Sequence, residues 1–266
     1  MIASAVLWAL AIAALGWAYL RSWRAARVEA GAGAANGWRL LAFATAIVLL
    51  VAALVGPLPE MSQRLLAAHV VQHLLILDFV PILLALSTTP AVLAPIDRHL
   101  RRLAASPLGS PPVLLVVYAG SLAFWHIPPL YDAALAHPAL HVVQNLQILA
   151  AGTLFWWREL APSEYRATRG IGVLFQMAGA KFLTGILASM IAFMPVLYDH
   201  YAALPPGSMT AAEDQQLGGL IMLAVEAVLF TVMVSALFVL ALAESDPDEP
   251  DPPPPTTPAQ PRSESV

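Results

Sequence analysis

The chain has 266 residues, of which 59 % are hydrophobic and 11 % are charged, and its mean hydropathy is +0.72. Soluble domains carry roughly 25 % charged residues, so this composition excludes an ordinary soluble protein and indicates an integral membrane protein. The net charge of −4 says little about partners, because much of the acid lies in one terminal tail.

Apolar segments, taken in chain order, predict about seven transmembrane helices. Unbroken runs of Ala, Leu and Val favour helices over a barrel, whose strands would alternate in hydrophobicity. Each run approaches the ~20 residues of helix that cross a ~30 Å hydrocarbon core. The predicted spans are 2–20, 38–55, 67–86, 112–126, 138–157, 170–194 and 217–242. We therefore predict an all-α, polytopic membrane helical bundle over residues 1–243.

Arginines predict the orientation of this bundle, because they gather in alternate loops. The arginine-rich loops and their borders hold Arg21, Arg24, Arg27, Arg39, Arg98, Arg101, Arg102, Arg158, Arg166 and Arg169, whereas the other loops hold only Arg64. The positive-inside rule then places the N-terminus outside and the C-terminus in the cytoplasm. The first span has no basic residue before it and no clear cleavage site, so we expect a retained helix. Residues 244–266 are acidic and proline-rich, which predicts a disordered cytoplasmic tail.

Histidines gather on the predicted outer side. Six of the seven, all except His99, lie at or near the outer ends of spans, namely His69, His73, His126, His137, His141 and His200. Two pairs, His69/His73 and His137/His141, have the i,i+4 spacing that puts both rings on one helix face. A single histidine near an interface is usually structural, but two pairs at equal depth indicate a shared metal or haem site.

The absence of cysteine narrows the chemistry of such a site. It excludes disulfides, iron–sulfur clusters and thiolate copper sites, so a soft metal would bind His or Met. Met190 and Met194 lie at a suitable height, although packing is the simpler reading of both. Asp214 precedes the last apolar run, where we expect it to cap that helix, and it could also support a metal ligand. Gly218 and Gly219 would allow close helix contact.

Three charges lie deeper in the predicted spans, Asp78, Lys181 and Glu226. At ~1.5 Å per residue they fall roughly 13–20 Å from the outer ends, where an isolated charge is costly. We expect Lys181 to bridge to Asp78 or Glu226. Two accounts stay open, a structural ion pair that fixes helix docking and a proton or ion path beneath the histidines.

Four segments of the chain resemble those of a known protein family. They are HVVQHLLILDFVP (69–81), FWHIPPLYDAALAHPALH (124–141), LFWW (154–157) and EDQQLGGLIM (213–222). In this order they resemble the seven-helix CtaG family of cytochrome c oxidase assembly proteins, over roughly residues 38–240. The resemblance implies functional polar positions at His69, His73, Trp125, His126, Tyr131, Asp132, His137, His141, Asp214 and Gln215. Asn145 departs from it, since the family often has a third histidine there, and Glu226 is peculiar to this chain or its lineage.

The resemblance implies a multi-pass protein of the bacterial inner membrane that matures the haem–copper oxidase. We expect it to support copper delivery through the outer histidine cluster, with oxidase subunits or other assembly factors and the lipid membrane as partners, and no nucleic acid. We expect no enzyme, because no nucleophile is paired with a base. The alternatives are a haem-binding membrane subunit and a metal-free assembly scaffold.

Overall fold

The computed structural model describes residues 2–167, 171–205 and 207–245. Within these residues the chain is helical and contains no strand. The long helices are α1 (Ile2–Glu29), α3 (Gly37–Leu54), α9 (Pro111–Trp125), α11 (Pro138–Leu160), α12 (Ile171–Phe193) and α14 (Ala211–Ser245). One further long rod consists of α5 (Leu66–Leu74), the π-helical turn η1 (Leu75–Phe79) and α6 (Val80–Ser87). The predicted tail, 244–266, lies outside the described residues from 246 onward.

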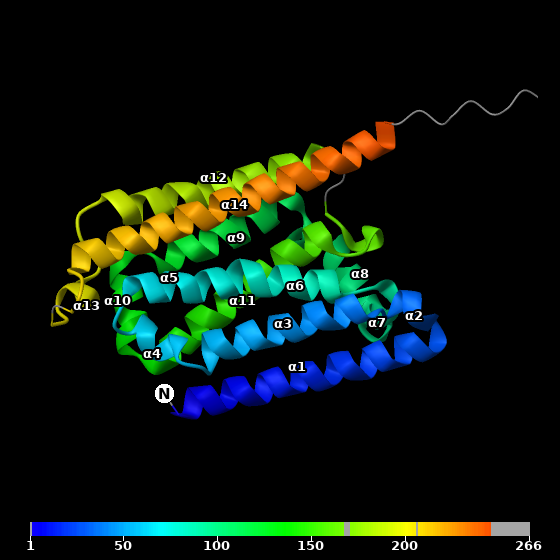
Figure 1. The fold of residues 1–266 in the computed structure, drawn as a ribbon, viewed down its shortest axis with the longest axis horizontal. Helices are drawn as coiled ribbons and strands as arrows, with labels where there is room; N and C mark the ends of the chain where they lie inside the picture. The colour runs from blue at the N-terminus through cyan, green and yellow to red at the C-terminus, as the bar shows by residue number, and fades with distance from the viewer. Residues whose placement is uncertain (1, 168–170, 206, 246–266) are drawn as a thin grey trace, which may run out of the picture.

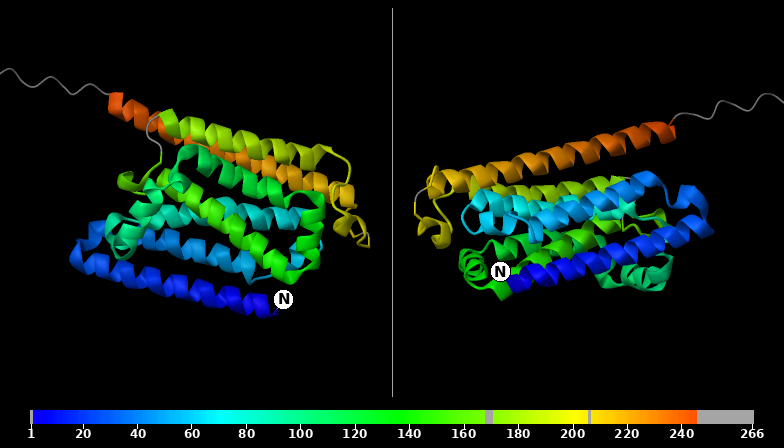
Figure 2. Two further views of the ribbon diagram at one scale, coloured as in Figure 1. Left: turned by 180° about the vertical axis from the view of Figure 1, so that it is seen from behind. Right: turned by 60° about the horizontal axis from the view of Figure 1, so that its bottom comes forward.

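Short helices connect these rods. They are α2 (Gly31–Ala34), α4 (Leu58–Ser62), α7 (Pro90–Leu93), α8 (Asp97–Ala105), α10 (Pro128–Ala136) and α13 (Asp199–Ala202), with 3₁₀ turns at Ala94–Ile96, Pro107–Gly109 and Ser163–Tyr165. In Figure 1 the long helices run roughly side by side, with α10, α13 and α4 gathered at one end of the bundle. We call this the histidine end. Figure 2 shows α1 at one edge of the bundle and the packed pair α12 and α14 at the opposite edge.

Each predicted span corresponds to a helix, but fewer than seven of these meet the requirements of a membrane span. Five are long and apolar enough to cross a bilayer, namely Ser4–Glu29, Gly31–Leu54, Leu66–Ser87, Gly172–Phe193 and Ala211–Ala236. The bent pair α9 and α10 makes a sixth if it is counted as one span. Helix α11 has the length but carries Gln144, Asn145 and Gln147 in its middle. The count of seven and the orientation of the termini therefore stay predictions.

Two prolines explain the bend after α9. Ile127 precedes Pro128 and takes extended backbone (φ −63°, ψ 120°), as residues before proline do. The chain then restarts as α10 at 71° to α9. This bend turns α10 across the histidine end, so that Tyr131 lies against the ring of His69.

The π-helical turn η1 changes which side chains share a face of the rod. In a regular α-helix, Asp78 would point about 140° away from His73, at ~100° per residue. A π-turn inserts one residue, which brings the two side chains close to an i,i+4 relation. Both then face α9, where His73 meets the ring of His126 and Asp78 meets the hydroxyl of Tyr118.

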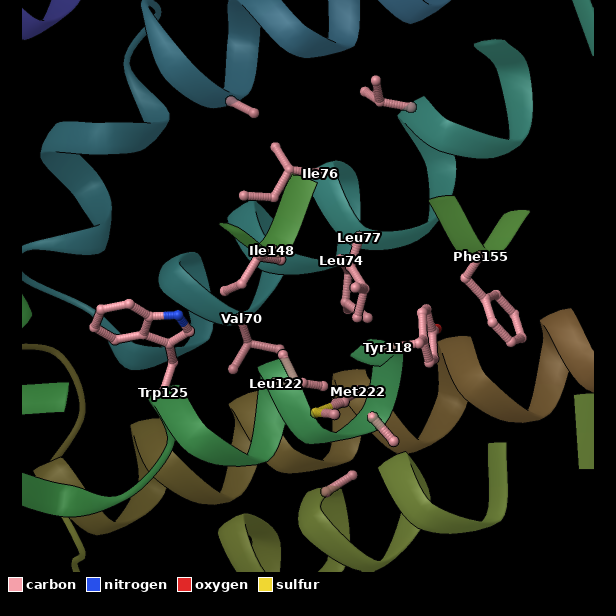
Figure 3. Close-up of a cluster of buried hydrophobic side chains, with 14 of the residues drawn as sticks. Val70, Leu74, Ile76, Leu77, Tyr118, Leu122, Trp125, Ile148, Phe155 and Met222 are labelled. Atoms are coloured by element: carbon pink, nitrogen blue, oxygen red, sulfur yellow. The ribbon is translucent and has the colours of Figure 1, made fainter. Parts of the chain in front are cut away.

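Close packing of small residues brings these helices together. Pro81 has no N–H, so the Leu77 carbonyl lacks its usual i+4 donor. This carbonyl lies against Gly152 of α11. A Cβ added to Gly152 would lie 2.1 Å from the carbonyl oxygen, so only glycine fits there. Gly219 meets Ala192 of α12 as closely, with a Cβ position 2.4 Å from its nitrogen, and Gly218 adjoins Ala67. The predicted close contacts at both glycines are confirmed. Figure 3 shows the apolar core beside them, in which Leu77, Leu122 and Phe155 lie among side chains of several helices.

Asp214 holds the start of α5. Its two carboxylate oxygens accept from the backbone N–H groups of Leu66 (2.6 Å) and Ala67 (3.1 Å), in another helix. The prediction that Asp214 caps its own helix is wrong. Helix α14 begins three residues earlier and is capped by Thr210 and Glu213, whose side chains bond each other's backbone N–H in a capping box.

The substitution Gly152→Ala should lower the melting temperature of the purified protein in detergent. Alanine normally stabilises a helix interior by ~0.5–1 kcal/mol relative to glycine, but overpacking of this contact should cost ~1–3 kcal/mol. Gly120→Ala in α9 is the matched control, because the nearest atom to its Cβ position is 3.9 Å away. Equal melting temperatures for both variants would contradict the packing described.

The substitution Asp214→Ala should destabilise the protein by about 0.5–2 kcal/mol, the usual cost of losing a cap. Asp214→Asn keeps one acceptor oxygen and should melt between wild type and Asp214→Ala. Thermal unfolding in detergent measures this order, and a wild-type melting temperature for Asp214→Ala would rule out the capping role.

Candidate functional site: a buried histidine cluster

Four histidine rings from three helices meet inside the histidine end. His69 and His73 come from α5, His126 directly follows the last residue of α9, and His141 is the fourth residue of α11. The ring centres of His69 and His141 are 5.4 Å apart, and those of His73 and His126 are 5.6 Å apart. His141 is half-buried and the other three are buried. The predicted convergence of the third and fifth spans is therefore present.

A hydrogen-bond chain fixes the protonation of the first pair. Tyr201 donates its hydroxyl proton to the Ser62 carbonyl (2.7 Å), so its oxygen accepts from Nδ1 of His69 (3.1 Å). Neutral His69 then has an unprotonated Nε2, which accepts from Nε2 of His73 at 3.0 Å. This assignment leaves the lone pair on Nδ1 of His73, a buried atom without a hydrogen-bond partner.

His126 is oriented in the way that metal-binding histidines commonly are. Its Nδ1 donates to the Leu122 carbonyl at 2.8 Å, so the lone pair of the neutral ring lies on Nε2. A backbone carbonyl on the second ring nitrogen fixes the tautomer and the ring orientation of such ligands. His141 is held less firmly, since Asn145 donates to its Nε2 over 3.5 Å.

A small cavity adjoins two of these rings. Its volume is about 10 Å³, which is about one water-sized sphere. The lining includes His73, His126 and the thioether side chain of Met222 from α14, and the remaining residues are apolar, Val70, Leu74, Leu77 and Leu122. Figure 3 shows Met222 beside Leu122 and Val70 in this core. The cavity thus combines two imidazoles and one sulfur in a space of ionic size.

A larger cavity reaches the other side of the cluster. It has a volume of about 290 Å³ and is lined by His141, Asn145 and Gln72 inside and by the exposed Glu60 at its rim. Polar side chains therefore line part of the cavity through which a ligand would reach the half-buried His141.

His137 lies outside the cluster, although its spacing to His141 suggested a shared face. Helix α11 begins at Pro138, so His137 is the residue before the helix, with extended backbone (φ −121°, ψ 105°) and an exposed side chain. The i,i+4 rule does not apply to a residue outside the helix.

The predicted supporting residues have other contacts. Asp132 accepts from the backbone N–H groups of Asp199 and His200, both at 3.2 Å, and so begins α13. Gln215 holds the preceding loop through the Leu197 N–H and the carbonyls of Met194 and Pro195. Met190, in the last turn of α12, and Met194, directly after that helix, are 46 % and 47 % exposed, whereas the histidines of the cluster are buried or half-buried. Their placement as metal donors finds no support in these contacts.

Sequence reasoning missed Met222 and Tyr201. The signal for Met222 was available, because Gly218, Met222 and Glu226 recur every four residues on the packed face of α14. No comparable pattern singled out Tyr201, which lies in the short helix α13. Among the described residues, no group of three or more His, Cys, Asp or Glu side chains is arranged to hold a metal ion. A site built on Met222 would not be of that type.

The three deep charges meet below the cluster. Nζ of Lys181 lies 3.0 Å from Oδ1 of Asp78 and 2.8 Å from Oε2 of Glu226. The predicted bridge is confirmed and reaches both carboxyl groups.

Comparisons with known proteins give one result. Searches of the curated proteins and of the solved structures return no match to this chain. The family model of the cytochrome c oxidase caa3 assembly factor (Caa3_CtaG) matches residues 17–244, which is most of the chain and includes every element of the histidine cluster. The chain therefore belongs to the Caa3_CtaG family of cytochrome c oxidase assembly factors.

Proposed function

We propose that this chain supports oxidase assembly by carrying copper in its histidine cluster and releasing it to the haem–copper oxidase. The observation that carries the proposal is the ion-sized cavity bordered by His73, His126 and Met222. The buried Nδ1 of His73, which has no hydrogen-bond partner, supports it further, since native proteins seldom leave such atoms unpaired.

The donor set suits a transferable copper ion. Imidazole binds both oxidation states of copper, and a thioether favours the cuprous ion. The groups around the cavity carry no formal charge when the histidines are neutral, so affinity is moderate and the metal can leave. The copper ion is cargo in this scheme, and the protein binds, orients and shields it.

The first histidine pair offers a second position. Two nitrogen ligands of one tetrahedral ion with ~2.0 Å bonds stand roughly 3.3 Å apart, and Nε2 of His69 is 3.0 Å from Nε2 of His73. In the hydrogen-bonded state His73 supplies the shared proton from Nε2, so an ion bound there would require the proton to move to Nδ1 of the same ring.

Haem is a weaker candidate than copper. A porphyrin needs several hundred Å³, in the range of ligand pockets, whereas the cavity beside His73 and His126 holds about 10 Å³. The cavity of about 290 Å³ has one histidine in its lining, His141, and so offers no second axial imidazole. The scaffold alternative rests on the chain from Ser62 through Tyr201 to the first histidine pair, which joins α4, α13 and α5 without metal.

His73→Ala and His126→Ala should each weaken copper binding by at least about tenfold and abolish maturation of the oxidase. These substitutions remove one donor from the cavity, and even loss of a residue that only supports a ligand costs about 10- to 100-fold. Metal analysis of purified protein after cuprous loading and oxidase activity of the host membranes measure the two effects.

His137→Ala is the matched control, because that exposed imidazole lies outside the cluster. It should retain copper and oxidase maturation. Wild-type protein that takes up no copper would refute carriage, and the scaffold would then explain any loss of oxidase in the cluster variants.

Met222→Leu should separate the two oxidation states. The exchange nearly conserves side-chain volume and should cost less than ~1.5 kcal/mol of stability. Cuprous affinity should fall, while cupric affinity stays close to wild type, because the thioether prefers the softer ion. Competition titrations with cuprous and cupric chelators test this, and equal losses for both ions would remove Met222 from the donor set.

A further inference from the structure

The deep charge cluster does not balance its own charge. It contains two carboxyl groups, Asp78 and Glu226, and one ammonium group, Lys181, and their side chains are 0 %, 4 % and 5 % exposed. If all three were ionised, the cluster would carry a net charge of −1. A fourth titratable side chain in the cluster, Tyr118, is neutral as a phenol and adds no positive charge. An uncompensated charge at this depth is costly, so one carboxyl group should hold a proton.

Asp78 is built to be the ionised carboxylate. Its Oδ1 accepts from the Tyr118 hydroxyl at 2.6 Å, the Trp156 indole N–H at 2.9 Å and Lys181 at 3.0 Å. Three donors aimed at one oxygen favour the charged form of a carboxyl group. These donors come from α9, α11 and α12, so they are fixed by the packing of the bundle.

Glu226 has far fewer partners. Lys181 approaches its Oε2 to 2.8 Å and Thr184 lies beside the carboxyl group, but neither carboxyl oxygen has a hydrogen bond of good geometry. The hydroxyl of the neighbouring Thr184 donates to the Ala180 carbonyl of its own helix. Glu226 is therefore the carboxyl group that should keep the proton.

The surroundings of Glu226 open toward the lipid. A groove of about 700 Å³ lies between α12 and α14, with Lys181 and Glu226 among its lining residues. Gly179 and Gly185 leave room in its wall, and Phe175 and Phe182, which are 72 % and 69 % exposed, border it. The two helices form one edge of the bundle in Figure 2, and exposed phenylalanines border the groove, so we expect the groove to face the hydrocarbon of the bilayer.

We propose that Glu226 is a lipid-accessible proton-binding site, a neutral carboxylic acid at neutral pH that lipid-soluble reagents reach through the groove between α12 and α14. Asp78 and Lys181 form the permanent ion pair beside it. This inference does not depend on copper carriage, because it concerns a different cluster.

A lipid-soluble carbodiimide tests the proposal on the full-length protein in detergent or lipid nanodiscs. The reagent dicyclohexylcarbodiimide reacts with a protonated carboxyl group. The acid proton moves to a carbodiimide nitrogen, the carboxyl oxygen adds to the central carbon, and the O-acylisourea rearranges to a stable N-acylurea without losing an atom. Mass spectrometry of peptides should locate one adduct, on Glu226, at pH 7. A water-soluble carbodiimide should label this site several-fold less.

Two variants make the test specific. Glu226→Gln should lose the adduct, and Asp78 should stay unlabelled in it. Asp78→Asn removes the competing negative charge, so Glu226 should ionise beside Lys181 and its labelling should fall several-fold. Labelling at Asp78 in place of Glu226, or no adduct in folded wild-type protein, would overturn the proposal.

Infrared spectroscopy tests the proposal without the Asp78→Asn variant, in case that variant does not fold. The C=O stretch of a protonated carboxyl group should be present in the wild-type spectrum at pH 7 and missing in Glu226→Gln. Its presence in both proteins at equal intensity would also overturn the proposal.

Discussion

The carboxylate of Asp78 is the contact on which the arrangement of helices depends. In a bilayer no water replaces a missing partner, so a buried anion must find its donors in the protein. Asp78 draws donors from α9, α11 and α12, and Lys181 extends the same cluster to α14. One side chain thereby fixes the rotation of its own rod against four neighbours, and the same rod carries His69 and His73.

Two polar layers result, separated by hydrocarbon. The histidines and the charges lie five residues apart on the rod, about 7.5 Å along its axis at 1.5 Å per residue. Leu74, Leu77 and Leu122 line the small cavity beside His73 and His126. On the rod itself, the residues between His73 and Asp78 are all apolar. The proton site that we propose at Glu226 is local and does not require an ion path through the three charges.

The sequence allowed much of this to be predicted. Hydropathy located every long helix, and helical spacing brought His69, His73 and His141 together. The errors share one physical cause, since spacing gives relative positions on a helix but neither its exact start nor its rotation. His137 falls one residue before α11, and the buried Ala188, Ile191 and Ala192 define an inner face of α12 that excludes Met190. Met194 falls one residue after α12 and is exposed. Asp214 was assigned to the nearest helix start in sequence, whereas its carboxylate reaches the start of α5, 148 residues away.

The π-helical turn has a consequence for comparing this chain with its relatives. Because one residue is inserted within Leu75–Phe79, Asp78 occupies the place that position 77 would have in a regular helix following His73. A relative without the wide turn would need its acid one residue earlier to face α9. A sequence alignment of this chain with such a relative would suggest that the buried acid had been lost, although only the type of helix had changed. Conservation of this carboxylate should therefore be judged by distance from the Tyr118 hydroxyl, not by position in an alignment.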